Sequence, residues 1–202
     1  IGNPELHSAL AQVAGALNLP ATQLWMGHYG PSGEKLDPMM RYPYPNWTPI
    51  GGWRIDPSLV FAHSLQESAF RTSVISGAGA RGLMQVKPTT AQEMARARGA
   101  FLSASDLDRP SVNLEYGQSY IEKLRDMNAT GGLLPKVIAA YNAGPAPVIR
   151  WNSEIRDNGD PLLFIESIPY WETRGYVSII LRNYWMYEIQ RGKNGGSMKG
   201  LA

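Results

Sequence analysis

Apolar residues recur at spacings of three and four along most of the 202-residue chain, whereas runs that alternate apolar and polar residues are scarce. Proline opens several of these segments, because its fixed φ suits the first helical position. The pattern predicts helices over 4–17, 20–27, 57–69, 88–98, 112–128 (with Ser111 as its N-cap), 133–143, 146–152, 161–167 and 171–191. The expected fold class is therefore all-α.

Two segments depart from the helical pattern. Residues 28–55 form a proline-rich loop that also carries the large aromatic residues Tyr42, Tyr44, Trp47 and Trp53 in its second half. Such residues favour packed positions, so we expect this long loop to be ordered. Residues 192–202 are Gly-rich, lack periodicity and are expected to form a flexible tail, which leaves residues 1–191 as one domain.

Composition narrows the function classes. The net charge is only +2 and the basic residues do not cluster, which argues against a nucleic-acid partner. The absence of cysteine excludes disulfides, and the three histidines lack the spacing of metal ligands, so we expect no metal and no cofactor. No run of eighteen apolar residues is present that would predict a transmembrane helix.

Glu67 is the most informative carboxylate, at the C-terminal end of the predicted helix over 57–69. Apolar and small residues surround it, the next basic residue is Arg71, and His63 and Phe70 are expected on the same helical face. Burial and the negative end of the helix dipole both raise the pKa of a carboxyl group in this position. A carboxylic acid that stays protonated can protonate a glycosidic oxygen. On the local pattern alone, a solvated helix-end glutamate remains open as the alternative.

Four motifs occur in a fixed order: QESAF at 66–70, GARGLMQ at 79–85, AAYNAGP at 139–145 and ESIPYWETRGYV at 166–177. Each is weak alone, but together they resemble the Slt-type soluble lytic transglycosylases over about residues 57–191. The resemblance implies a lysozyme-like fold of the goose type. It also implies cleavage of the MurNAc-β-1,4-GlcNAc bond of peptidoglycan, with formation of 1,6-anhydromuramoyl ends.

The resemblance also assigns roles by position. It implies that Glu67 is a single catalytic residue that acts first as acid and then as base. It implies saccharide contacts by Ser76, Met84, Gln85, Tyr141, Asn142 and Glu166. Lys87 departs from the pattern, in which an apolar residue usually precedes the proline, and its role is open between a contact with the anionic glycan and a solvated surface position.

No second catalytic carboxylate is evident next to Glu67. Asp56 precedes it by three helical turns and is interpreted as a helix cap, and Glu93 lies on another predicted helix. Glu166 lies within a motif, and the resemblance implies that it is a structural or positioning group. A single acid fits a mechanism in which the acetamido oxygen of the substrate stabilises the oxocarbenium-like state, which is our hypothesis here.

Two other functions are weighed against the transglycosylase. One is a goose-type lysozyme-like hydrolase of the same bond, and the other is a catalytically inactive peptidoglycan-binding domain. For residues 28–55, an aromatic ring that lines or supports the sugar groove is weighed against a purely structural clasp.

Location and partners follow from the expected substrate. Peptidoglycan strands are the expected partner of a monomeric protein in the periplasm or cell envelope, and envelope protein partners are unknown. The chain starts at Ile1, and we expect a signal peptide and an N-terminal helical extension to be missing from it.

Overall fold

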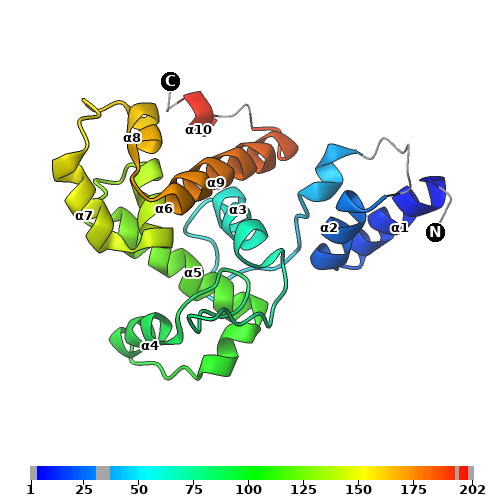
Figure 1. Ribbon diagram of the computed structural model, residues 1–202. Coiled ribbons are helices and arrows are strands. Elements are labelled where there is room, and N and C mark those ends of the chain that lie inside the picture. The colour runs from blue at the N-terminus through cyan, green and yellow to red at the C-terminus, as the bar shows by residue number, and fades with distance from the viewer. Residues whose placement is uncertain (1–3, 31–36, 194–195, 200–202) are drawn as a thin grey trace.

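The computed structural model describes residues 4–30, 37–193 and 196–199, and almost all of the regular structure in this part is helical (Figure 1). The elements, in chain order, are α1 (Pro4–Ala16), α2 (Pro20–His28), η1 (Pro38–Arg41), α3 (Pro57–Ser68), α4 (Pro88–Ala97), η2 (Ala104–Asp108), α5 (Pro110–Arg125), α6 (Leu134–Ala143), α7 (Pro145–Glu154), α8 (Pro161–Ser167), α9 (Trp171–Gln190) and α10 (Gly196–Lys199). The all-α prediction is confirmed, and each predicted helix is present with its ends shifted by a few residues.

Some predicted boundaries are wrong. Ser111 does not cap α5, because Pro110 occupies the first helical position and Arg109 stands at the N-cap, so that Ser111 lies in the first turn. The short 3₁₀ turns η1 and η2 were not predicted, since single turns carry too few residues to show a period. The structure adds α10 within the predicted tail, where the Ser197 hydroxyl donates to Glu188 at 2.5 Å. The flexibility of residues 192–202 stays a prediction, and 31–36 of the loop lie outside the described residues.

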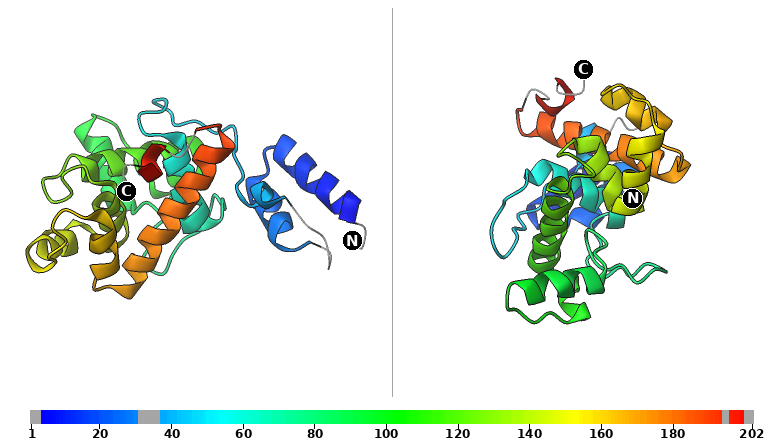
Figure 2. Two further views of the ribbon diagram at one scale, coloured as in Figure 1. Left: turned by 90° about the horizontal axis from the view of Figure 1, so that it is seen from above. Right: turned by 90° about the vertical axis from the view of Figure 1, so that its left-hand side faces the viewer.

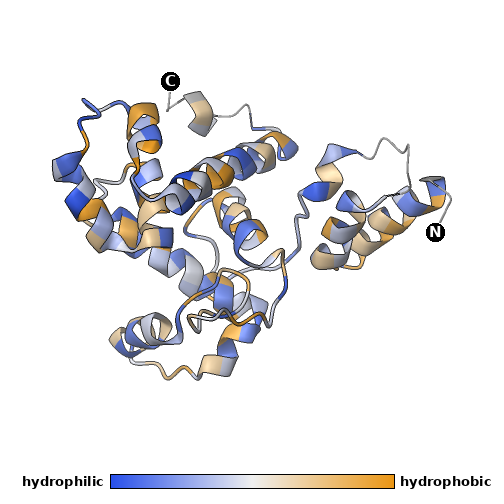
Figure 3. Cartoon of the chain, viewed as in Figure 1, coloured by the Kyte–Doolittle hydropathy of each residue, from blue (hydrophilic) through white to orange (hydrophobic). Residues whose placement is uncertain are grey.

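The core is built around α3, which packs against α9 along its length and touches α5 (Figure 1). Val60, Phe61 and Ala62 of α3 are almost completely buried. Hydrophobic and hydrophilic residues are interspersed along α9 (Figure 3), and its buried residues recur at spacings of three and four. Helix α3 is instead buried on every side from Ser58 to Ser64. Asp56 caps α3 by accepting a hydrogen bond from the Ser58 N–H at 2.9 Å, which agrees with its interpretation as a cap.

Helices α1 and α2 lie beside the other helices, as Figure 1 and the left view of Figure 2 show. Ala11, Ala14 and Met26 form a small apolar cluster of their own between the two helices. Leu24 of α2 belongs instead to the main core, so the pair is attached through one face of α2. Among the described residues, no helix has both the length and the apolar character needed to span a membrane.

The aromatic residues of the loop before α3 pack inward. The ring of Tyr44 lies 4.8 Å from that of Phe61, and the ring of Trp53 lies 5.5 Å from it, both edge-on. Tyr42 contacts Tyr187 of α9 at 5.6 Å in the same geometry. These contacts favour the structural clasp over a role in lining the sugar groove, and they brace the helix that carries Glu67.

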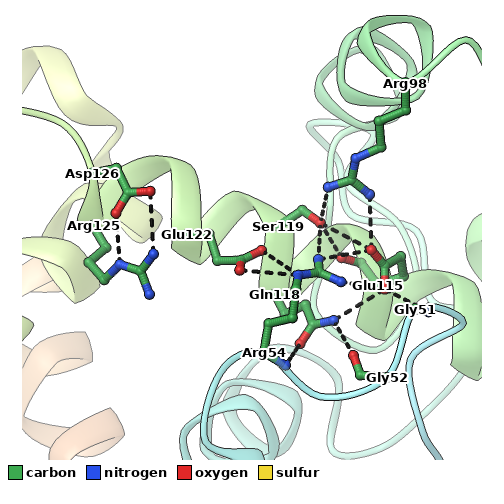
Figure 4. Close-up of polar contacts among 10 residues, drawn as sticks. All are labelled: Gly51, Gly52, Arg54, Arg98, Glu115, Gln118, Ser119, Glu122, Arg125 and Asp126. Atoms are coloured by element: carbon green, nitrogen blue, oxygen red, sulfur yellow. Dashed lines mark hydrogen bonds and ion pairs between the residues drawn. The ribbon is translucent and has the colours of Figure 1, made fainter.

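A polar cluster fastens the same loop to α5 (Figure 4). The carboxylate of Glu115, 7% exposed, accepts from Arg54 and from Arg98 at 2.9 Å each, and from the Gly51 N–H at 3.1 Å. Gln118 accepts from the Arg54 backbone N–H at 3.0 Å and donates to the loop carbonyl at Gly52 at 2.8 Å. The buried carboxylate of Glu115 on α5 thus connects this helix to the loop and to the C-terminal end of α4.

Candidate active site

Glu67 lies in the last turn of α3, where the chain leaves the helix abruptly. Ala69 and Phe70 follow with φ of 51° and 61°, in the left-handed region that residues other than glycine rarely adopt. Phe70 is only 2% exposed and anchors this turn in the core. The helix therefore ends before Phe70, and the helical face expected to include it does not extend that far. Strained backbone of this kind is concentrated at functional sites, where surrounding packing maintains it.

The environment of Glu67 favours its protonated form. Burial raises the pKa of the Glu67 carboxyl from 4.5 to about 7, and a hydrogen bond from Tyr176 acts in the opposite direction. No ion pair to Glu67 is found within the described ranges. The nearest basic residue in sequence, Arg71, donates instead to the Ser68 carbonyl at 3.0 Å. The carboxyl is therefore partly protonated near neutral pH and can give up a proton.

A hydrogen-bond chain orients this carboxyl from behind. The Tyr176 hydroxyl of α9 donates to Glu67 Oε1 at 2.5 Å, and its oxygen lies 2.9 Å from Nδ1 of His63. Burial lowers the pKa of His63 to about 3, so its ring is neutral. Because the single hydroxyl proton of Tyr176 is given to Glu67, Nδ1 of His63 carries its hydrogen and donates to the tyrosine oxygen. Tyr176 thus holds Oε1 as an acceptor, which leaves Oε2 as the oxygen that can carry the transferable proton.

Glu67 opens onto a cavity of about 540 Å³. Its walls come from α3, the segment over 76–90, α5, the end of α6 and the start of α9. The residues that line it are Glu67, Ser76, Ala78, Ala80, Gln85, Val86, Lys87, Thr90, Tyr120, Tyr141, Asn142, Ala143, Gly144 and Glu172. The structure therefore brings together Glu67 and four of the predicted saccharide contacts, Ser76, Gln85, Tyr141 and Asn142.

The sequence of residues 82–85, Gly-Leu-Met-Gln, predicts the start of a helix. In the structure these residues instead form a tight turn between the bridged residues Arg81 and Val86, so that prediction is wrong. The Asn113 side chain of α5 holds this turn by accepting from the Met84 N–H at 2.8 Å and donating to the Arg81 carbonyl at 2.8 Å. Gly82 has a φ of 76°, and a Cβ there would lie 2.2 Å from the Asn113 amide nitrogen. A glycine is therefore required where the turn meets α5.

Gln85 and Ser76 are held by the backbone of the same segment. Gln85 has a φ of 48°, and its Nε2 donates to the carbonyls of Val74 and Gly82 at 3.1 and 3.0 Å. The Ser76 hydroxyl oxygen accepts from the Ala80 N–H at 3.0 Å. Both side chains are thereby fixed before any ligand binds, and the hydroxyl hydrogen of Ser76 and the Oε1 of Gln85 remain for a substrate.

The other predicted contacts have different positions. The Met84 side chain is fully buried, and its carbonyl accepts from the Tyr141 hydroxyl at 2.8 Å, so Met84 supports the wall rather than facing a ligand. Asn142 is held by Thr173, whose hydroxyl donates to its Oδ1 at 2.7 Å. Glu166 is exposed on α8, outside the residues that line the cavity, and its backbone carbonyl accepts from Arg174 at 3.0 Å.

Three residues of the site were missed by the sequence reasoning. Glu172 lines the cavity and was not among the carboxylates weighed as a second catalytic group, and the single catalytic acid stays a prediction. Tyr176 and His63 complete the chain behind Glu67. Glu172 and Tyr176 both lie inside the ESIPYWETRGYV motif, so the motif pointed to them without giving their roles. His63 precedes Glu67 by four residues, which placed it on the right face, but only the fold brings Tyr176 to it.

Comparison with known proteins agrees with this geometry. The sequence profile described as the transglycosylase SLT domain matches residues 50–163. The soluble lytic murein transglycosylase of Escherichia coli (strain K12) is 36% identical over 132 residues, which are 64% of this chain and 20% of that protein. Membrane-bound lytic murein transglycosylase C of Actinobacillus pleuropneumoniae serotype 5b (strain L20) is 38% identical over 104 residues, which are 48% of this chain and 28% of that protein.

A solved structure is similar over nearly the whole chain. The crystal structure of the 70 kDa soluble lytic transglycosylase from Escherichia coli superimposes with a TM-score of 0.79 at 30% identity, covering 92% of this chain and 30% of that one. The fold is therefore lysozyme-like, as predicted. The chain spans only about a fifth to a third of the length of these relatives.

Proposed function

Because the chain belongs to the transglycosylase SLT domain family, we propose that it is a lytic transglycosylase that cleaves the MurNAc-β-1,4-GlcNAc bond of peptidoglycan. The observation that carries this proposal is Glu67, a carboxyl whose pKa burial raises to about 7, at the wall of a cavity of about 540 Å³. An acid with a pKa near the working pH is suited to give and to take the same proton.

In the first step, protonated Glu67 donates its proton to the glycosidic oxygen as the bond from that oxygen to C1 of the muramoyl residue breaks. Positive charge develops at C1 and the ring oxygen, and the acetamido oxygen of the substrate stabilises it. Tyr176 donates to Oε1 throughout, because burial and the neighbouring Glu67 raise the pKa of its hydroxyl well above the ordinary value. The departing sugar takes the proton and leaves as a neutral alcohol.

In the second step, Glu67 is ionised and acts as base. It accepts the proton of the muramoyl 6-hydroxyl while the 6-oxygen bonds to C1, which closes the 1,6-anhydro ring. Glu67 is protonated again, no water is consumed, and the site is ready for the next bond. Among the cavity residues, Ser76, Gln85 and Asn142 are the fixed polar groups that orient the sugars, and Tyr141 supports the wall through its bond to Met84.

A second carboxylate at the cavity bears on the main rival. A hydrolase needs a base to activate water, and Glu172, exposed at the rim, is the candidate for that role. Family membership favours the transglycosylase, and Glu172 is then a substrate-positioning group. The exposed Lys87, which also lines the cavity, is the candidate contact for a carboxylate of the peptide-bearing glycan.

The location follows from the substrate. Relatives of this chain are named both soluble and membrane-bound lytic murein transglycosylases. A protein that acts on peptidoglycan works outside the cytoplasmic membrane, so the proposed location is the periplasm or the cell envelope, and the proposed partner is the glycan strand bound by a monomer.

Mass spectrometry of digested peptidoglycan tests the reaction. We expect products with 1,6-anhydromuramoyl ends, one water lighter than reducing ends, and no release of such products by the Glu67→Gln variant. Predominantly reducing ends would identify a hydrolase. If the unaltered protein binds glycan strands and releases no products, the chain is a binding domain instead.

A further inference from the structure

A second cavity of about 380 Å³ adjoins the one that holds Glu67. It is lined by Asn142, Ala143, Glu172 and three residues just before or at the start of α9, Pro169, Tyr170 and Trp171, together with Thr173. Asn142, Ala143 and Glu172 line both cavities. The two are therefore successive parts of one groove, and an extended ligand that fills the first runs into the second.

Trp171 is the notable residue of this second cavity. Its side chain is 79% exposed. A single exposed apolar side chain is common on protein surfaces, whereas a group of them usually marks a binding site. Trp171 is not isolated, because Tyr170 beside it is 45% exposed and also borders the cavity. The pair gives the groove an aromatic edge at a place where the rest of its lining is polar or small.

The surroundings of this edge are rigid. The Tyr170 ring packs edge-on against the buried Trp151 at 5.1 Å, and its hydroxyl accepts from Arg150 at 3.0 Å. At the junction of the two cavities, the Thr173 hydroxyl donates to Asn142 Oδ1 at 2.7 Å. That bond fixes the Asn142 amide and leaves its Nδ2 as a donor for a ligand. A flat apolar surface beside a fixed amide donor suits a pyranose ring, which has an apolar C–H face and a polar rim.

From these contacts we propose that the second cavity is an additional saccharide subsite, in which the Trp171 indole stacks on a sugar ring of the same strand that Glu67 cleaves. This inference rests on the proposed function, since it takes the strand at Glu67 to be a glycan. The subsite adds affinity for strands long enough to reach from Glu67 past Glu172 to the aromatic edge.

Binding of peptide-free glycan strands of increasing length tests the subsite. The measurement uses the Glu67→Gln protein, which does not consume the ligand, with and without Trp171→Ala. We expect Trp171→Ala to weaken binding of long strands roughly three- to tenfold, the size of one aromatic stacking contact, and to weaken binding of the shortest strands less. Trp171→Phe keeps a ring and should retain most of the affinity. Phe101→Ala removes another exposed ring, 92% exposed and outside both cavities, and should leave binding unchanged.

The possible failures can be told apart. If the protein binds no glycan of any length, the proposed function and the subsite both fall. If it binds strands and Trp171→Ala has no effect, or has the same effect at every length, the proposed function stands and the subsite is wrong. A loss confined to strands that carry stem peptides would assign Trp171 to the peptide and overturn the sugar subsite. Equal melting temperatures of the Trp171 and Phe101 variants show that folding is not the cause.

Discussion

At the scale of single residues, Glu67 combines two properties that are usually in conflict. Its pKa is raised by burial, yet Tyr176 donates to it and favours its ionised form. The balance places the pKa at about 7, where one group can serve as acid and then as base. The neutral His63 ring adds no charge to the site, and its hydrogen bond to Tyr176 only orients the tyrosine hydroxyl.

The raised pKa of Glu67 makes a prediction about stability. Between pH 4.5 and about 7 the unfolded chain releases the proton and the folded protein keeps it, so the folded state loses stability as pH rises through this window. Above it, the buried charge destabilises the protein by about 3 kcal/mol. Glu67→Gln removes this charge, so we expect the variant to unfold at higher urea concentration than the unaltered protein at pH 8 and at a similar one at pH 4.

Glu166→Gln is the matched control, because that glutamate is exposed on α8. Its urea midpoint should follow the unaltered protein at both pH values. The quantity to compare is the difference in stability between Glu67→Gln and the unaltered protein. If this difference is the same at pH 8 as at pH 4, burial does not raise the pKa of Glu67.

Removal of the Tyr176 hydroxyl has a different signature. Tyr176→Phe takes away the hydrogen bond that favours ionised Glu67, so the pKa of Glu67 should rise further. Since activity falls as the acid loses its proton, the alkaline limb of the kcat/KM profile should move to higher pH, with kcat reduced because the carboxyl is less well oriented. The measurement is the pH profile of product release.

Tyr187→Phe serves as the control for Tyr176→Phe. Tyr187 lies on the same helix, is completely buried, and donates to the Pro43 carbonyl at 3.0 Å, away from Glu67. Tyr176→Phe loses the bonds to Glu67 and to His63, and Tyr187→Phe loses one buried bond, at a cost of about 1 kcal/mol for each bond. Only the Tyr176 variant should shift the alkaline limb of the kcat/KM profile. A shift in both variants would mean that the effect comes from a general loss of rigidity in α9.

At the scale of elements, the helices could be predicted and the segments between them could not. Proline at the first position, as at Pro57 and Pro161, together with helical periodicity, located the helices within a few residues. The turn over 82–85 was misread, because its Gly-Leu-Met-Gln sequence is compatible with a helix. Only Asn113, far along the chain on α5, decides that it is a turn. The same limit applies to the site, since the bond between Glu67 and Tyr176 joins residues 109 positions apart.

This turn makes a prediction of its own. Gly82 and Gly79 have nearly equal φ values of 76° and 75°, so alanine is strained at either position by about 1 kcal/mol. At Gly82 the new methyl group would also lie 2.2 Å from Asn113 and 2.3 Å from the Leu107 carbonyl, whereas nothing lies within 4 Å at Gly79. We expect Gly82→Ala to lower the free energy of unfolding by about 3 kcal/mol or more, and Gly79→Ala by about 1 kcal/mol, in urea denaturation.

The comparison of these two variants isolates the clash from the backbone strain. Gly82→Ala should also weaken catalysis in protein that remains folded, because Asn113 holds the wall that carries Gln85. Equal losses of stability at Gly79 and Gly82 would show that the turn can move away from α5 without cost.

At the scale of the whole molecule, the site depends on how the loop before α3 is held. Its aromatic rings pack on α3 and α9, and its backbone is tied to α5 through Gln118 and Glu115 (Figure 4). The sequence predicted that this loop is ordered but left its role open. The packing partners lie more than a hundred residues away on α9 and about sixty away on α5, which no local pattern reveals.

Glu115 of α5 contacts both the loop before α3 and Arg98 at the end of α4. Its nearly buried carboxylate accepts from two arginines, and Glu115→Gln removes the negative charge that Arg54 and Arg98 share, although Arg54 keeps its ion pair with Glu122. Because the arginine side chains are 34% and 45% exposed, water can take over part of the lost interaction, and we expect a loss of about 1–3 kcal/mol rather than the larger loss typical of a fully buried pair.

Asp126→Asn is the matched control for this change. Arg125 and Asp126 form a similarly short ion pair of 2.8 Å at the C-terminal end of the same helix, but their side chains are 46% and 65% exposed (Figure 4). An exposed pair contributes little, so this variant should change the free energy of unfolding by less than about 0.5 kcal/mol. Urea denaturation of both variants measures the difference. If the two losses are equal, the Glu115 charge adds no more than an ordinary surface pair, and the loop that positions Glu67 is held by its other contacts, such as the aromatic packing on α3 and α9 and the bonds to Gln118.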